Sequence, residues 1–304
     1  MISIIIPLYN KASLIGRALT SIIAQNCENC EIIVVDDGST DNGVAVVKTF
    51  VEDNRLNNLR IISQNNAGVG AARNSGIAEA KGDLITFLDA DDEWKSDHLS
   101  DLIELSQRYP HCAVFATNYE NISADGLTFP NVIRNLTISG EMGVIENYFE
   151  IAAASNPPLW TSAVMARTDA LRAIGGFPEG IKSGEDLLTW ARLAAKYEIA
   201  YCCNVSAIYH RGSSNPRPPE KIDLLGKEFE NLYHYISAEK LNKKNSGMRH
   251  YIALWYNMRM SRCLAHRMYC PAWKALWKSL RYRPTIRIAK PLVKFTLIGL
   301  QRKA

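Results

Sequence analysis

Apolar runs of strand length alternate with amphipathic stretches along the first two thirds of the chain. The first run, from Ile2 to Leu8, is rich in β-branched residues and is followed by the turn-forming Asn10, which indicates a buried strand. A helical pattern follows over residues 14–23, and a second apolar run over residues 31–37 indicates another buried strand. A strand, a helix and a strand within about 35 residues predict a parallel βαβ unit.

The same alternation continues as far as three prolines at positions 216, 218 and 219, which indicate a boundary. Further strands are predicted over residues 59–62, 84–88, 113–117, 162–165 and 200–209, hairpin-like signals lie within 121–140, and further helices are predicted over 44–51, from 68 onward, over 167–174 and over 183–196. The pattern predicts an α/β fold with a mostly parallel central sheet over residues 1–215 and a helical extension over residues 216–304.

Carboxylates follow two of these predicted strands. Asp36 and Asp37 end the second strand, and Asp89, Asp91 and Asp92 follow the strand over residues 84–88. The carboxyl ends of parallel strands lie along one edge of a sheet, where open α/β sheets bind ligands, so these side chains can converge. Carboxylate oxygens suit Mg²⁺ or Mn²⁺, which favours a metal and diphosphate site. A polar turn after a buried strand is the alternative.

The predicted helix over residues 183–196 carries Glu185 and Asp186 in its first turn. The helix macrodipole favours negative charge at that position. Simple capping of the helix is therefore one interpretation, and a functional carboxylate pair is the other.

Composition is that of an ordinary globular protein, with 47% apolar and 22% charged residues, but the net charge of +4 is unevenly distributed. Residues 1–239 contain 19 basic and 31 acidic side chains, whereas residues 240–304 contain 16 basic and no acidic ones. Helical spacing predicts an apolar face of Trp273, Leu276, Trp277 and Leu280 opposite Lys274, Lys278 and Arg281. Residues 287–300 repeat this mixture.

Three interpretations of this basic region are open. Tryptophan together with lysine and arginine favours binding to an anionic membrane surface. Nucleic acid is a competing partner, but no nucleic-acid-binding motif is present, so we expect none. A helical arm packed on the rest of the protein or on a partner chain is the third.

The cysteines and the N-terminus indicate a cytoplasmic protein. Seven cysteines, an odd number without a paired framework, fit a reducing compartment. Cys27 and Cys30 have the spacing of half a zinc or redox site, but no second such pair completes it. The apolar run at residues 2–8 is short and lacks a basic leader, so we expect no signal peptide.

Five motifs in register resemble those of family 2 glycosyltransferases with the glycosyltransferase A fold. They are Pro7-Leu-Tyr-Asn10, Val34-Val-Asp-Asp-Gly-Ser-Thr-Asp41, Asn66-Ala-Gly-Val-Gly-Ala-Ala-Arg-Asn-Ser-Gly76, Phe87-Leu-Asp-Ala-Asp-Asp92 and Gly184-Glu-Asp186. The resemblance implies one Rossmann-like catalytic domain over residues 1–215, with a nucleotide-binding half at 1–117 and an acceptor half at 118–215. It also implies inverting transfer from a nucleotide-diphosphate donor, a UDP-sugar, to a saccharide or polyprenyl-linked saccharide acceptor in cell-surface polysaccharide synthesis.

The resemblance assigns the nucleotide-sugar to Pro7, Tyr9, Asn10, Asp36, Asp37, Arg73, Asp89 and Ala90. Tyr9 would stack on the base, whose edge a carboxylate would bind, and core packing of Tyr9 is the alternative. Arg73 would reach the diphosphate or the base, unless it is an ordinary exposed helix residue.

The resemblance also assigns metal and catalytic roles. Asp89 and Asp91, the Asp-x-Asp motif, would hold Mn²⁺ or Mg²⁺ on the diphosphate, and His210 would contact metal or phosphate unless it is structural. Asp186 would be the catalytic base, and Glu185 would help to place the acceptor. Trp160 and Trp190 would stack on acceptor sugars or pack in the core.

Two other functions remain open from the sequence. A nucleotidyltransferase that makes sugar nucleotides usually carries a glycine-rich basic loop after the first strand, where this chain has Tyr9-Asn-Lys-Ala-Ser13. A non-catalytic module that binds saccharide or membrane is disfavoured by the complete set of carboxylates.

Overall fold

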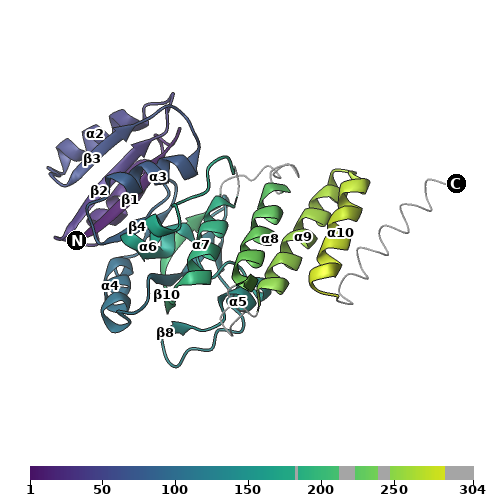
Figure 1. The fold of residues 1–304 in the computed structure, drawn as a ribbon. Helices are drawn as coiled ribbons and strands as arrows, with labels where there is room; N and C mark the ends of the chain where they lie inside the picture. The colour runs from purple at the N-terminus through teal and green to yellow at the C-terminus, as the bar shows by residue number, and fades with distance from the viewer. Residues whose placement is uncertain (182–183, 212–222, 239–246, 285–304) are drawn as a thin grey trace.

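The structure is a computed structural model that describes residues 1–181, 184–211, 223–238 and 247–284 (Figure 1). Its strands are β1 (Ile2–Leu8), β2 (Cys30–Asp36), β3 (Leu59–Ser63), β4 (Leu84–Phe87), β5 (Glu93–Trp94), β6 (Val114–Ile122), β7 (Thr128–Pro130), β8 (Met142–Ile145), β9 (Val164–Arg167) and β10 (Ile199–His210). Its helices are α1 (Ile15–Ile23), α2 (Gly43–Asp53), α3 (Val69–Glu79), α4 (His98–Arg108), α5 (Tyr148–Ala154), the 3₁₀ turn η1 (Thr161–Ala163), α6 (Thr168–Ala173), α7 (Glu185–Lys196), α8 (Asp223–Ala238), α9 (Met248–Ala265) and α10 (Tyr269–Tyr282).

The described residues form one mixed sheet in the order β3-β2-β1-β4-β9-β6-β10-β5, with β7 paired to β6 and β8 paired to β10. Strands β1 to β4 pair in parallel, with Leu8 opposite Asp36 and Ile5 opposite Phe87. Strand β9 is antiparallel to both β4 and β6, and β10 is parallel to β6. The strands β1, β2, β4, β6 and β10 therefore all point the same way, and their carboxyl ends share one edge.

Both faces of the sheet are buried, which explains why β1 and β2 are continuous apolar runs. Ile4 and Ile6 belong to one hydrophobic cluster, which α1 and α4 cover. Ile5, between them, belongs to a second cluster that includes residues of α3, α5, α7, α8, α9 and α10. The alternation follows from the two-residue period of a strand.

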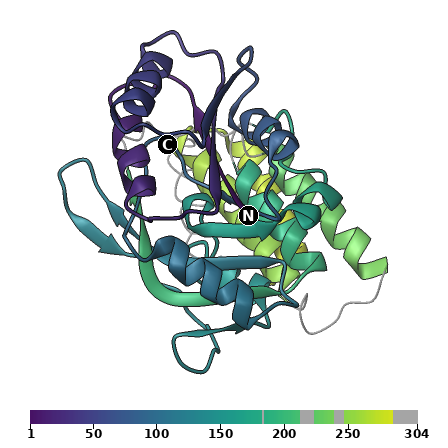
Figure 2. The same cartoon turned by 90° about the vertical axis from the view of Figure 1, so that its left-hand side faces the viewer.

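The predicted α/β class with a largely parallel sheet is confirmed, and most differences concern short elements. The strand expected at 113–117 extends to Ile122, and the hairpin signals after it correspond to the pairing of β6 with β7, which projects at the left of Figure 2. Residues 161–163 form a 3₁₀ turn, so β9 begins only at Val164. The elements β5, β8, α4 and α5 were not predicted.

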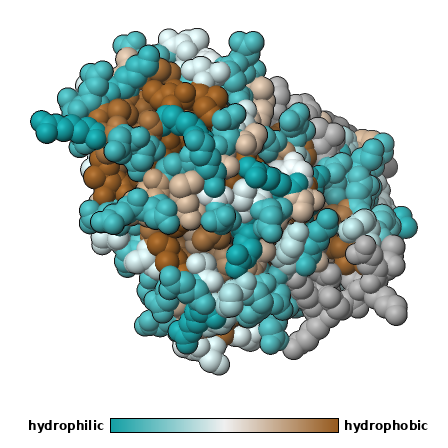
Figure 3. Space-filling model, turned by 60° about the vertical axis from the view of Figure 1, so that its left-hand side comes forward, coloured by the Kyte–Doolittle hydropathy of each residue, from teal (hydrophilic) through white to brown (hydrophobic). Residues whose placement is uncertain are grey.

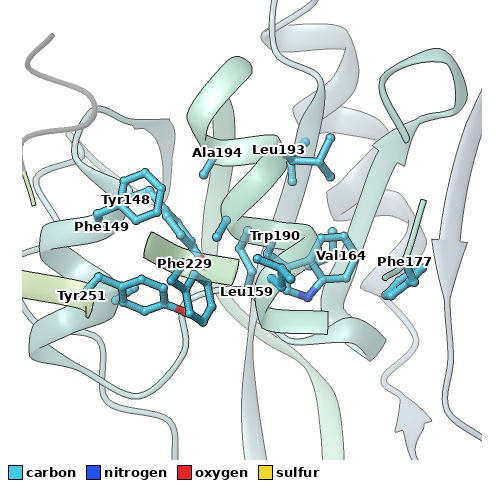
Figure 4. Packing of buried hydrophobic residues seen from close by; sticks show 14 of the residues in the cluster. Tyr148, Phe149, Leu159, Val164, Phe177, Trp190, Leu193, Ala194, Phe229 and Tyr251 are labelled. Carbon is cyan, nitrogen blue, oxygen red and sulfur yellow. The ribbon is translucent and has the colours of Figure 1, made fainter. Parts of the chain in front are cut away.

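Helices α8, α9 and α10 lie at the end of the molecule opposite β1 to β3 and continue its core (Figure 1). Phe229 of α8 stacks with Trp255 of α9 at 5.2 Å between ring centroids, and Tyr251 lies 5.8 Å from Phe149 of α5 (Figure 4). This packing corresponds to the third interpretation of the basic region, a helical arm on the rest of the protein. Residues 287–300 and the prolines at 216, 218 and 219 lie outside the described residues.

The predicted apolar face of α10 is wrong in part. The helix packs through Ala272, Ala275, Leu276 and Ser279, all buried. Trp273 and Trp277 are instead 43% and 59% exposed, beside the exposed Lys274. The face of α10 that packs on α9 contains small residues, which allow the two helices to approach closely. The spacing of the large apolar residues did not indicate this face.

Within the part of the chain that the structure describes, none of the helices has both the length and the hydropathy needed to cross a bilayer. All seven cysteines are free thiols.

Candidate active site

The shared carboxyl edge of the sheet gathers most of the predicted site. Strand β1 ends beside Tyr9, β2 ends at Asp36, β4 leads into Asp89, and β10 ends at His210. Helix α7 begins at Glu185, after Gly184 with φ of +83°, a left-handed conformation that favours glycine.

Asp37 and Asn10 hold loops at this edge. The buried Asp37 carboxylate accepts hydrogen bonds from the Gln64 side chain at 2.8 Å and from the backbone N–H groups of Ala67 and Gly68 at 2.9 and 2.8 Å. Asn10 accepts the Thr40 N–H at 2.8 Å. Both residues therefore hold the loops that follow β1, β2 and β3 in place.

Other residues predicted to contact the nucleotide-sugar differ in solvent exposure. Tyr9 is 47% exposed, so its ring is free of the core and the packing alternative is excluded. Asp36 is buried and accepts the Ser39 N–H at 3.0 Å. Pro7 and Ala90 are buried.

The three carboxylates after β4 have separate environments. Asp89 is 24% exposed and accepts a hydrogen bond from Arg73, whereas Asp91 is 33% exposed and pairs with Lys11. Asp92 is buried and accepts hydrogen bonds from the Ser162 hydroxyl at 2.6 Å, the Trp160 indole at 3.2 Å and the His210 N–H at 3.2 Å. Burial and the nearby Asp89 charge raise the pKa of Asp92 well above its usual range. Asp92 therefore connects the segment after β4 to η1 and to the end of β10.

Arg73 links the segment after β4 to the first turn of α7. Its guanidinium, 3% exposed, donates to Asp89 at 2.7 Å and to Glu185 at 3.0 Å, and lies 5.0 Å from the Phe177 ring centroid. The exposed-helix alternative for Arg73 is excluded. Gly70 lies close to this bridge: a Cβ there would make a tight contact of 3.3 Å with the carbonyl oxygen of Pro178 and an ordinary contact of 3.6 Å with Glu185.

Asp186 is a half-buried carboxyl in the first turn of α7. Burial, followed by the neighbouring charge of Glu185, raises the pKa of Asp186 to about 6, against the opposing effect of Arg73. A carboxyl with this pKa is largely ionised at neutral pH and yet more basic than a free aspartate, which suits a general base.

Trp190 does not fit its predicted role, whereas His210 has a partner within the protein and its contact with metal or phosphate stays a prediction. The Nε2 atom of His210 lies 2.9 Å from Glu93, and the ligand atoms of His210, Asp89 and Asp91 do not all come within 4.8 Å of one another. Trp190 is completely buried, with its ring 6.2 Å from that of Phe87 and 5.7 Å from that of Phe177 between centroids, so it is a core residue and no acceptor platform. Figure 4 shows it among other buried side chains, with Phe177 nearby. Trp190 lies on the apolar face of α7, and the helical spacing of the apolar residues in the sequence already indicates this position.

Trp160 keeps a position compatible with acceptor binding. It is partly exposed, and its ring lies 4.3 Å from Tyr209 and 5.6 Å from Tyr119 between centroids. The two tyrosines, Lys11 and Ser162 contact predicted site residues, and the sequence did not single them out. No spacing signal connects them, because they come from four distant segments.

Asp89 and Asp91 fit a hard divalent cation, because both offer partly exposed carboxylate oxygens at the ligand-binding edge. Among the residues with described coordinates, the group of three ligand-type side chains that lies within 4.8 Å is His111, Cys112 and Glu198. That group is on another part of the sheet, and its cysteine is fully buried.

Known sequences place the chain in a family. The sequence model described as Glycosyl transferase family 2 matches residues 3–156. An uncharacterised glycosyltransferase of Nostoc sp. is 43% identical over 106 residues, which cover 35% of this chain and 33% of that protein. The Bacillus subtilis glycosyltransferase TuaG, provisionally named for teichuronic acid biosynthesis, is 26% identical over 257 residues, covering 78% of this chain and 91% of its own.

Solved structures share the fold. Residues 1–349 of Staphylococcus aureus TarS superpose with a TM-score of 0.69 at 22% identity, covering 93% of this chain and 81% of that one. The mannosyltransferase PcManGT of Pyrobaculum calidifontis, solved with GDP-Man and Mn²⁺, gives 0.64 at 18% identity, covering 98% and 80%.

The chain belongs to glycosyltransferase family 2, because the family model covers half of its length. Its fold is the glycosyltransferase A fold, which it shares with TarS and PcManGT. The chain spans about a third of the length of several relatives, 33% of the Nostoc protein and 31% of an uncharacterised Rickettsia felis glycosyltransferase.

Proposed function

We propose that the protein is an inverting, metal-dependent glycosyltransferase that moves a sugar from a UDP-sugar to a saccharide acceptor. The observation that carries this proposal is the Arg73 bridge, which connects Asp89 of the Asp-x-Asp motif to Glu185, the neighbour of Asp186. In this proposal, the two Arg73 contacts join the part of the site that binds the donor to the part that accepts the proton.

The chemistry follows from the positions of these carboxylates. Asp186 takes the proton of an acceptor hydroxyl as the oxygen attacks the anomeric carbon, because a neutral hydroxyl is a weak nucleophile. A divalent cation held by Asp89 and Asp91 would supply charge neutralisation for the departing diphosphate. Attack from the face opposite the leaving group inverts the anomeric centre, as in inverting glycosidases.

The donor and the acceptor are proposed from chemistry and from relatives. TarS has been solved with UDP-GlcNAc, and PcManGT with GDP-Man, so neighbours of this fold bind nucleotide sugars. The name of TuaG supports a role in cell-surface polysaccharide synthesis. Trp160 is the acceptor platform in this proposal, because a partly exposed indole can stack on the apolar face of a sugar ring. Residues 1–215 would be the catalytic domain and residues 216–304 its extension.

The proposal is tested by a screen for nucleotide release from UDP-, GDP- and TDP-sugars. The screen is run with Mn²⁺, with Mg²⁺ and with a chelator. We expect release from a UDP-sugar only with a metal. Asp91→Asn should lower the release about a hundredfold or more, because it removes a charged ligand beside the leaving group.

Asp169→Asn is the matched control, since Asp169 is an exposed aspartate in the first turn of α6, outside the site. Full activity in the chelator or in Asp91→Asn would contradict the metal role. Pyrophosphate release from a nucleoside triphosphate and a sugar phosphate would instead identify a nucleotidyltransferase, and saccharide binding without nucleotide release a non-catalytic module.

We also propose that the extension docks on the anionic inner face of the cell membrane, where a polyprenyl-linked acceptor would be presented. Exposed apolar residues are common on soluble proteins, and Figure 3 shows such patches on a different face, so exposure alone is weak support. The support is the combination on α10: Trp273 and Trp277 lie 6.1 Å apart next to Lys274 and Arg281, in a region without acidic residues.

Sedimentation with phosphatidylcholine vesicles, with and without phosphatidylglycerol, tests the docking. Trp273→Ser combined with Trp277→Ser should reduce binding to the anionic vesicles about tenfold, because interfacial tryptophans and basic charge act together. Deleting residues 240–304 would be a poorer test, since α9 packs in the core.

The matched control is Leu127→Ser with Phe129→Ser, which removes two side chains of similar exposure, 57% and 45%, from the β7 hairpin region. Equal loss of binding in both double variants, or none in either, would count against a specific role of α10.

A further inference from the structure

We propose that Lys11 is a built-in counterion of the metal site: its ammonium group holds Asp91 while no cation is bound, and an arriving cation displaces it. The inference rests on the proposed metal dependence and assigns a role to a residue that no motif includes. Lys11 Nζ lies 2.6 Å from Asp91 Oδ2, and their side chains are 38% and 33% exposed.

The backbone around this pair is fixed while the pair itself can exchange. Arg17 donates to the backbone carbonyl of Asp91 and lies 3.8 Å from Glu93, so the loop is held independently of Lys11. The Asp91 carboxylate can therefore change its partner without moving the chain. Lysine suits such a role, because its ammonium sits on a flexible four-carbon stem.

Arg73 provides the contrast within the same site. Its guanidinium is 3% exposed and pairs with two carboxylates, so its removal would leave buried charges unpaired. The Lys11 pair is a partly exposed contact, and such pairs contribute little to stability. A divalent cation carries twice the charge and prefers the same carboxylate oxygens, so it would compete with Lys11 for Asp91 without disturbing the fold.

A displaced Lys11 remains on the segment between β1 and α1, at the carboxyl edge where the diphosphate would lie. Its charge would then favour the bound nucleotide. The inference therefore predicts effects of opposite sign when the charge is removed: tighter binding of the metal alone and weaker binding of UDP in the presence of metal.

The test measures Mn²⁺ binding to the nucleotide-free protein by electron paramagnetic resonance, and UDP binding at saturating Mn²⁺ by calorimetry. We expect Lys11→Gln to tighten Mn²⁺ binding about threefold to tenfold and to weaken UDP binding by a similar factor. Lys11→Arg should stay close to the wild type. Lys278→Gln is the charge-matched control, since it removes a lysine whose partner Glu230, at 3.0 Å, is on α8.

Each outcome decides a different point. Unchanged Mn²⁺ binding in Lys11→Gln would overturn the inference and leave the proposed function standing. Weaker binding of both Mn²⁺ and UDP would also overturn it, because Lys11 would then support the site in every state. Absence of Mn²⁺ binding in the wild type and the variant would overturn the proposed metal dependence, and this inference with it.

Discussion

Replacing Asp186 with asparagine should lower the rate of sugar transfer about a thousandfold, with little change in donor affinity. The amide has nearly the shape of the carboxyl group but cannot accept the proton of the acceptor hydroxyl, and a positioned base contributes about 10² to 10⁴ in rate. Steady-state kinetics with the donor from the screen would give kcat and the Michaelis constant of the donor separately.

The pH profile adds a readout that a merely structural role would not change. Because the pKa of Asp186 is raised to about 6, its reactive carboxylate form is lost as the pH falls through 6 and is fully present above about 7. The wild-type rate should fall about tenfold per pH unit below 6. This acidic limb should disappear from the residual rate of Asp186→Asn, while Asp169→Asn should keep it. A variant with more than a third of wild-type activity would place the base elsewhere.

Replacing Arg73 with methionine should lower the free energy of unfolding by about 3 kcal/mol and abolish transfer. The guanidinium is buried and is the partner of Glu185, 9% exposed, and of Asp89, 24% exposed. Removing one side of a buried ion pair leaves the other charge uncompensated, which costs about 3–5 kcal/mol, and the partial exposure of Asp89 places the expected loss near the lower limit. Urea unfolding followed by circular dichroism would measure it.

Two further variants separate this effect from a general loss of charge. Arg73→Met with Glu185→Gln should regain part of the stability without regaining activity, because the buried negative charge is then removed too. Arg60→Met breaks a more exposed pair with Glu31, at 3.0 Å, and should cost no more than about 1 kcal/mol. Equal losses in Arg73→Met and Arg60→Met would contradict the buried bridge.

Local sequence patterns predicted most of the sheet and the identity of the main carboxylates. The apolar runs at β1, β2 and β4 are readable because both faces of these strands are buried, and the aspartates that follow them are placed by strand direction alone. The class of the protein could be predicted for the same reason. Its motifs are short segments, and the role of each depends on its position next to a strand.

Only the tertiary structure shows which residues far apart in the sequence contact one another. The sequence could name Arg73, Asp92 and Trp190, but it gave no partner within the protein for Arg73 or Asp92, and it allowed Trp190 to face the acceptor. In the fold Arg73 reaches Glu185, 112 positions away, and Asp92 reaches His210, 118 positions away.

The two kinds of information differ for a physical reason. The period of a strand or helix fixes which face of its own element a side chain occupies, and this is local. Whether that face meets solvent, an opposite charge or another helix depends on contacts between segments far apart in the chain. The exposed tryptophans of α10 and the pairing of Lys11 with Asp91 therefore belong to the folded protein, whereas the apolar strands and the aspartates at their ends were already determined by the sequence.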